Sequence, residues 1–82
     1  MQVLNLCFMQ ALEIRFGKAV RRLRESRGIS QEDFASRAEI HRTYISSVER
    51  GKVVVSIGVA ERIASALEMP LSRLFKETEN EG

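Results

Sequence analysis

The stretch from residue 29 to residue 52, ISQEDFASRAEIHRTYISSVERGK, predicts two short helices joined by a tight turn. Ser30 can cap a helix by accepting a hydrogen bond from the amide three residues later. Apolar residues then recur at helical spacing, and Ile45 and Val48 show the same spacing further along. Only about three residues separate the two periodic segments, which is the spacing of a helix-turn-helix. The sequence therefore predicts helices over 31–38 and 42–50.

Three further amphipathic helices surround this pair. Apolar residues three and four positions apart predict a helix over 16–27 that is ended by Gly28. Ser56 can cap a helix whose apolar stripe runs to Leu67, and Pro70 suits the first turn of a short fifth helix. No strand pair is evident, so the predicted fold class is all-α, with five helices and short connections.

The chain has 82 residues, which is enough for one small domain. We assign residues 16–76 to the helix-turn-helix domain, residues 77–82 to a flexible acidic tail and residues 1–15 to an N-terminal extension. Apolar side chains of the extension spread around a helical wheel and form no single stripe. Two interpretations of it stay open, namely that it packs on a partner subunit or that the natural start is Met9. Cys7 is expected to be a small buried hydrophobic residue.

The composition argues against several classes of function. One His and one Cys cannot supply the three or four ligands of a zinc site. No glycine-rich phosphate loop and no nucleophile elbow are present. We therefore expect no enzyme, no metal and no cofactor. No apolar run approaches the roughly 18 residues of a membrane-spanning helix, and the single cysteine fits a reducing cytoplasm.

Charge is distributed unevenly along the chain. Residues 15–52 carry ten Lys or Arg and five Asp or Glu, whereas residues 53–82 carry three and five. A basic middle beside an acidic end is typical of a molecule that turns one face toward a polyanion. Ordinary solvated helix faces show similar runs, so the charge alone leaves both interpretations open.

The predicted helix over 42–50 has two different faces. On a helical wheel Ile45 and Val48 lie on the side toward the core. Guanidinium groups can pair with guanine edges, and hydroxyls and a threonine methyl adapt to other bases, whereas an acid would be repelled by phosphate. The side opposite Ile45 and Val48 carries guanidinium and hydroxyl groups and no acid. This composition favours double-stranded DNA as the partner over a plain solvated surface. They come from Arg42, Thr43, Ser46, Ser47 and Arg50.

Glu49 falls near the buried side of the same helix, where an unpaired carboxylate is costly. Arg24 lies at the edge of the apolar stripe of the helix over 16–27. The residues leave two interpretations open. The two side chains form a bidentate pair that fixes one helix on the other, or they are unrelated surface charges.

The quoted stretch resembles the helix-turn-helix of the lambda-repressor/Cro family, also called the xenobiotic-response-element class. The downstream run SIGVAERIASALEMPLSRLF, residues 56–75, resembles the two helices that complete this five-helix domain. The resemblance covers about residues 16–76. The run RTYIS at 42–46 is especially similar to controller proteins of restriction–modification systems.

The resemblance implies a homodimeric regulator that reads a two-fold symmetric operator with its third helix in the major groove. It makes the structural ion pair Arg24–Glu49 the favoured interpretation. It implies base reading by Arg42, Thr43 and Ser47, with Ser46 adjacent. It implies phosphate contacts from Gln31, Tyr44, Arg50 and Lys52.

Two positions depart from the family pattern. Glu39 stands where Gly is usual, so a non-glycine residue must tolerate the backbone of the turn at some strain. His41 stands where a Ser, Thr, Asn or Asp cap is usual. We expect it either to fill space or to contact phosphate when protonated.

The leading interpretation is a sequence-specific regulator of transcription that binds double-stranded DNA as a homodimer. RNA polymerase or a partner protein is a further candidate partner, and no membrane is involved. The alternative is a protein-interaction module, such as an antitoxin that binds a partner protein through the apolar N-terminus or the Val53–Val55 run. An RNA-binding domain is the weaker hypothesis, because readers of single-stranded RNA offer several exposed aromatics and only Tyr44 lies near the basic face.

Overall fold

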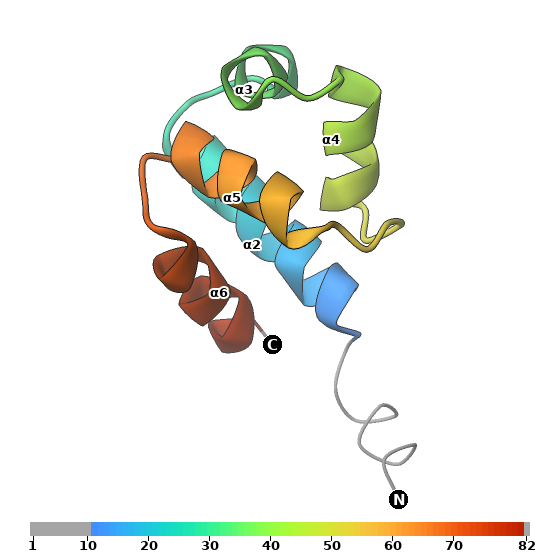
Figure 1. Cartoon of the computed structure of the whole chain (residues 1–82), viewed down its shortest axis with the longest axis vertical. Coiled ribbons are helices and arrows are strands. Elements are labelled where there is room, and N and C mark those ends of the chain that lie inside the picture. The colour runs from blue at the N-terminus through green and yellow to red at the C-terminus, as the bar shows by residue number, and fades with distance from the viewer. Residues whose placement is uncertain (1–10, 82) are drawn as a thin grey trace, which may run out of the picture.

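The computed structural model describes residues 11–81, which form five helices and, within that range, no strand. In Figure 1, α2 and α5 cross the middle of the domain, α3 and α4 form one end, and α6 lies on the other side. This arrangement confirms the predicted all-α fold. The helices are α2 (Leu12–Ser26), α3 (Gln31–Ala38), α4 (Arg42–Glu49), α5 (Ile57–Ala66) and α6 (Leu71–Asn80).

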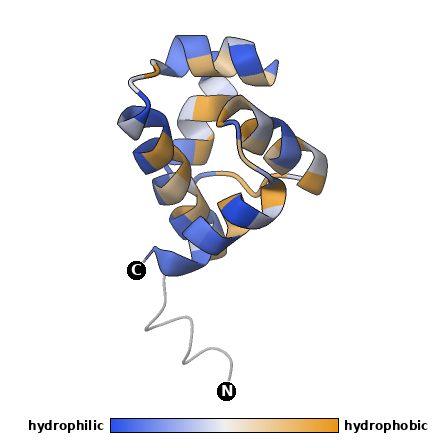
Figure 2. Cartoon of the chain, turned by 90° about the vertical axis from the view of Figure 1, so that its left-hand side faces the viewer, coloured by the Kyte–Doolittle hydropathy of each residue, from blue (hydrophilic) through white to orange (hydrophobic). Residues whose placement is uncertain are grey.

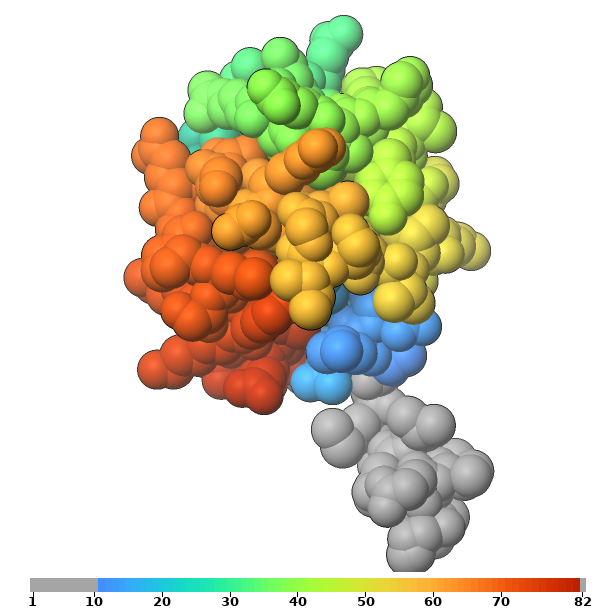
Figure 3. Space-filling model, in the orientation of Figure 1, coloured from blue at the N-terminus to red at the C-terminus, as the bar shows by residue number. Residues whose placement is uncertain are grey.

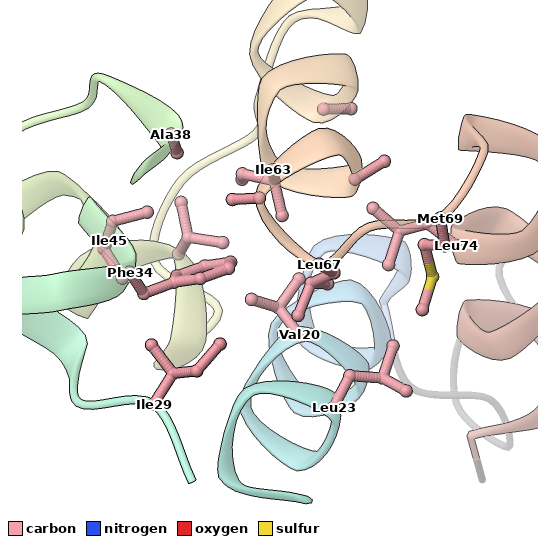
Figure 4. Packing of buried hydrophobic residues seen from close by; sticks show 14 of the residues in the cluster. Val20, Leu23, Ile29, Phe34, Ala38, Ile45, Ile63, Leu67, Met69 and Leu74 are labelled. Atoms are coloured by element: carbon pink, nitrogen blue, oxygen red, sulfur yellow. The ribbon is translucent and has the colours of Figure 1, made fainter. Parts of the chain in front are cut away.

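One apolar core joins the five helices. Its fully buried side chains come from every helix and include Val20, Phe34, Ile45, Ile63 and Leu74. Figure 4 shows these side chains converging from separate helices. Figure 2 shows hydrophobic residues on the inner sides of the helices and hydrophilic residues on the outer sides. This amphipathic pattern is the reason that apolar spacing located the helices.

The turn between α3 and α4 is as short as predicted. Ser30 Oγ accepts a hydrogen bond from the amide of Asp33 at 3.0 Å, which caps α3. The helix ends at Glu39, whose backbone is left-handed at φ 58° and ψ 44°. The amide of Ile40 then donates to the carbonyl oxygen of Ala35 at 3.0 Å. A glutamate therefore holds a conformation that costs an L-residue roughly 1–2 kcal/mol.

Two helices are longer than predicted. Helix α2 begins at Leu12, so residues 12–15 belong to the folded domain and not to an extension. Helix α6 continues to Asn80, so the predicted flexible tail over 77–82 is wrong for the residues up to that point. Residues 1–10 of the predicted extension, including Cys7, lie outside the described residues.

Contacts with α2 account for the extra turns of α6. Arg22 donates to the carboxylates of Glu77, at 2.9 Å, and of Glu81. Thr78 is buried, and its hydroxyl donates to the carbonyl oxygen of Leu74 at 2.9 Å. Nothing in the sequence indicated the contacts of Glu77 and Glu81, because their partner Arg22 lies 55 and 59 positions away. No helix within residues 11–81 has both the length and the apolar character to cross a membrane.

Candidate nucleic-acid interface

Helix α4 carries its polar side chains on the outside of the domain. Ile45 is buried in the core, whereas Arg42 and Thr43 are exposed and Ser46 and Ser47 are half-buried. Figure 1 shows α4 at an edge of the domain, with no other helix across its outer side. The structure thus brings all four predicted base-reading side chains to the surface of one helix. None of the four side chains makes a hydrogen bond or ion pair with the described part of the chain.

The start of α4 is capped by His41. Its Nδ1 accepts a hydrogen bond from the amide of Thr43 at 3.1 Å. A ring nitrogen can accept only when it carries no proton, so this contact requires neutral imidazole with the proton on Nε2. The structure therefore gives His41 a capping role that neither of the sequence-based alternatives included.

Arg24 and Glu49 come together in a buried, bidentate ion pair. Nε of Arg24 donates to Oε2 of Glu49 at 2.6 Å, and Nη2 donates to Oε1 at 3.0 Å. The two side chains are only 10% and 2% exposed. The hydrogen bonds to Glu49 raise the pKa of Arg24 above its ordinary value. Two parallel bonds fix orientation as well as distance, so the pair holds α4 on α2 in one geometry.

Two more hydrogen bonds extend this ion pair into a network. Nη1 of Arg24 donates to the carbonyl oxygen of Ile29, in the connection between α2 and α3, at 2.7 Å. Nε2 of Gln31, the first residue of α3, donates to Oε1 of Glu49 at 3.0 Å. The network therefore joins α2, the start of α3 and α4. An amide nitrogen carries two hydrogens, so Gln31 can donate to Glu49 and to a phosphate at once.

The other predicted phosphate-binding residues lie around α4. Tyr44 is half-buried and packs against the core, which leaves one side of it accessible. Arg50 and Lys52 are exposed just beyond the last turn of α4. The amide of Lys52 donates to the carbonyl oxygen of Ser47 at 3.0 Å, so its backbone position is fixed by the helix. Basic side chains thus flank the polar face at its carboxyl end.

Gly17 was missed by sequence reasoning, although it determines how closely α2 and α4 approach. A Cβ added at this position would overlap the carbonyl oxygen of Val48 and lie 3.0 Å from that of Glu49. Only glycine allows the two backbones to come so near. A lone glycine inside an apolar helical stripe is the sequence signal that could have revealed this crossing.

The chain belongs to the helix-turn-helix family HTH_3, which matches residues 20–74. Among curated proteins it is similar to the control protein C.MunI of Mycoplasma sp., with 43% identity over 74 residues that cover 89% of this chain and all of that protein. This assigns it to a class of DNA-binding regulators of transcription and confirms the predicted similarity to restriction–modification controller proteins.

Solved structures agree with this assignment. The restriction–modification controller protein C.AhdI from Aeromonas hydrophila has 36% identity and a TM-score of 0.74, covering 77% of this chain and 96% of that one. The controller protein C.Esp1396I has 29% identity and a TM-score of 0.80, covering 89% of this chain and 94% of that one. The five-helix arrangement is therefore shared with controller proteins along nearly their full length.

Proposed function

We propose that this protein is a sequence-specific regulator that binds double-stranded DNA as a homodimer, with α4 of each copy in the major groove of a two-fold symmetric operator. The outer face of α4 is the observation that carries the proposal. It presents guanidinium and hydroxyl groups and no acid, because Glu49 is turned inward and paired with Arg24. A face of this kind fits both base edges and the negative potential of the groove.

Within this interface the side chains have different tasks. Arg42, Thr43, Ser46 and Ser47 read base edges, because they project from the face of α4 that no other helix covers. Phosphate contacts come from side chains at the margins of α3 and α4, and they set affinity and register without reading sequence. These are Gln31, Tyr44, Arg50 and Lys52.

Dimer formation is part of the proposal, because one helix of eight residues reads only a few base pairs. Two copies related by a two-fold axis place their reading helices about 34 Å apart, one turn of the duplex. The connection that follows α4 supplies an apolar surface for this contact. Val54 and Ile57 are 79% and 75% exposed, and Phe75 of α6 is 42% exposed beside them. These exposed apolar side chains lie together, which makes them our candidate for the contact between the two copies.

The last part of the proposal concerns cofactors and regulation. Within the described residues no cluster of His, Cys, Asp or Glu is arranged to hold a metal ion. We propose that the protein works in the cytoplasm without a cofactor and without catalysis of its own. Its activity then depends on its concentration, its dimerisation and contacts with RNA polymerase or a partner protein.

Selection of an operator, followed by titration, tests the proposal. The selected duplex and a scrambled duplex are titrated with the protein at two salt concentrations, with fluorescence anisotropy as the readout. We expect tight binding of the selected duplex and a steep loss of affinity with salt. Arg42→Ala should cost about 1–3 kcal/mol of discrimination at one position of each half-site. Lys52→Ala should weaken binding to all sequences and reduce the salt slope by about one.

Arg73→Ala is the matched control, because Arg73 is exposed on α6, away from α4. It should leave discrimination unchanged. Duplex binding that ignores both Arg42 and Lys52, or that is absent from every duplex, would overturn the proposal. That outcome would favour the alternative function, a module that binds a partner protein through the apolar surface around Val54.

A further inference from the structure

An apolar groove runs along the side of the domain below α4. Its walls are the first turns of α2, the connection over residues 53–56, the start of α5 and one side of α6. Its volume is about 380 Å³, and most of its lining is apolar. In Figure 3 these walls meet where the blue start of α2, the yellow-orange connection and the red α6 adjoin.

The groove has the chemistry of a site for apolar side chains. Leu12 and Phe16 of α2 both line it, and Leu12 is 61% exposed whereas Phe16 is buried. Only Glu13 and Glu79 bring charge to the lining. These two acids would repel an acidic ligand, and the hydroxyls of Ser56 and Thr78 already bond within the chain. The favoured occupant is therefore apolar and carries no negative charge.

The sequence provides such an occupant next to the groove. Residues 1–10, MQVLNLCFMQ, contain seven apolar residues and no charged side chain. Leu12, which lines the groove, follows this segment by only two positions. Ten residues can span up to roughly 33 Å when extended, which is ample to turn back over a groove that begins at Leu12.

We propose that the apolar part of this segment, residues 3–9, docks in the groove of its own chain. The inference rests on the proposed function, because the groove includes the surface assigned above to dimer formation. The segment therefore competes with the second copy. A tethered segment acts at an effective concentration of the order of millimolar, so weak docking suffices against a dilute partner.

The consequence is a concentration threshold for operator binding. Only the fraction of molecules with an open groove can dimerise, and the apparent dissociation constant rises as that fraction falls. Both copies must have an open groove, so the dimer association constant falls with the square of the open fraction. If roughly a third of the molecules are open, dimerisation weakens about tenfold.

The first test compares the full chain with a chain that begins at Met9 and keeps every described helix. Sedimentation over a range of concentrations gives the two dimer dissociation constants. We expect the shorter chain to dimerise at least tenfold more tightly. In the full chain, Leu6→Ser with Phe8→Ser should reproduce this gain, and Gln2→Ser with Asn5→Ser should not. An equal or weaker dimer from the shorter chain would overturn the proposal.

The second test detects docking directly and does not depend on DNA. Cys7 is the only cysteine of the chain and accepts a nitroxide label. In dilute, isotope-labelled protein we expect the nitroxide to broaden the methyl signals of Val54 and Ile57 in the same molecule. Broadening seen only when the nitroxide and the isotope are on different molecules would assign the segment to a second copy. That result, like no broadening at all, would refute docking within one chain.

Operator titration of the chain that begins at Met9 separates the two proposals. If it binds no selected duplex, the proposed function fails, and the nitroxide measurement still decides where the segment docks. If it binds the duplex and the nitroxide leaves the groove signals unchanged, only the present inference fails.

Discussion

Two arginines that are two positions apart on α2 anchor different parts of the domain in different ways. Arg24 pairs with Glu49 of α4 through side chains that are 10% and 2% exposed. Arg22 pairs with Glu77 of α6 through side chains that are 49% and 21% exposed. Arg24 forms a bidentate contact with one buried carboxylate, whereas Arg22 bonds two separate carboxylates that are more exposed to water. Loss of a partner should therefore cost more at the buried contact, where water cannot replace the missing group.

The comparison separates a firm region from a looser one. In the firm region a four-membered network fixes α4, the helix that reads DNA in our proposal, on α2 and α3. In the looser region the carboxyl end of α6, which forms one wall of the apolar groove, depends on solvated ion pairs and on one buried residue, Thr78. This division suits a rigid reading surface beside a contact surface that can adjust.

The largest effect is expected from Glu49→Ala. It leaves the buried guanidinium of Arg24 without its carboxylate, and breaking a buried pair in this way costs about 3–5 kcal/mol. Urea denaturation at pH 7 measures the loss of unfolding free energy. Glu81→Ala, which removes one carboxylate from Arg22, is the matched control and should cost much less. Equal losses from the two variants would show that burial does not distinguish the two contacts.

The next effect tests the close crossing of α2 and α4. Gly17→Ala forces a methyl group against the backbone of α4 and should cost about 1–3 kcal/mol of stability, as overpacking typically does. Gly58→Ala, in the first turn of α5, places a methyl in open space, with its nearest neighbour 3.9 Å away. It should leave stability unchanged or raise it by about 0.5–1 kcal/mol. A tolerated Gly17→Ala would mean that the two helices can separate freely.

A smaller effect is expected from Arg22→Ala, which removes the two solvated ion pairs that join α2 to Glu77 and Glu81 at the carboxyl end of α6. It should cost less than about 1 kcal/mol, because water screens exposed pairs and their side chains lose entropy on pairing. Amide hydrogen exchange should nevertheless rise selectively in the last turns of α6. An unchanged exchange rate there, with the loss spread over the whole domain, would contradict a local role.

The smallest effect concerns acid. The hydrogen bond from Arg22 lowers the pKa of Glu77 below its ordinary value. Its carboxylate therefore adds stability above the pKa of an unfolded glutamate, about 4.3, and this stability is lost as pH falls through the lower folded value. Thermal unfolding at pH 7 and pH 3 should show a weaker acid dependence in Glu77→Gln than in the parent chain. Glu79→Gln serves as the exposed control, and an equal change in both would refute the assignment.

The sequence predicted local features well. Ser30, the apolar stripes and the short turn located three of the five helices closely, because helices depend on neighbours three and four positions apart. It also placed Glu49 near the core, which made Arg24 a reasonable partner. The outer face of α4 followed from the same wheel, so the candidate interface was visible before the fold.

What the sequence missed depends on contacts between distant positions. Gln31 bonds to Glu49 across 18 positions, and Arg22 bonds to Glu77 across 55. Neither pairing leaves a periodic signal. His41 was missed for another reason, since its role requires one ring tautomer that residue type alone does not specify.

The separation between the network around Arg24 and the outer face of α4 has a consequence for how this protein can diverge. The side chains of Arg42, Thr43, Ser46 and Ser47 bond to nothing in residues 11–81, so exchanging them should cost the fold little. New target sequences can then arise by a few substitutions on an unchanged scaffold. The same property makes this small domain a practical starting point for laboratory retargeting.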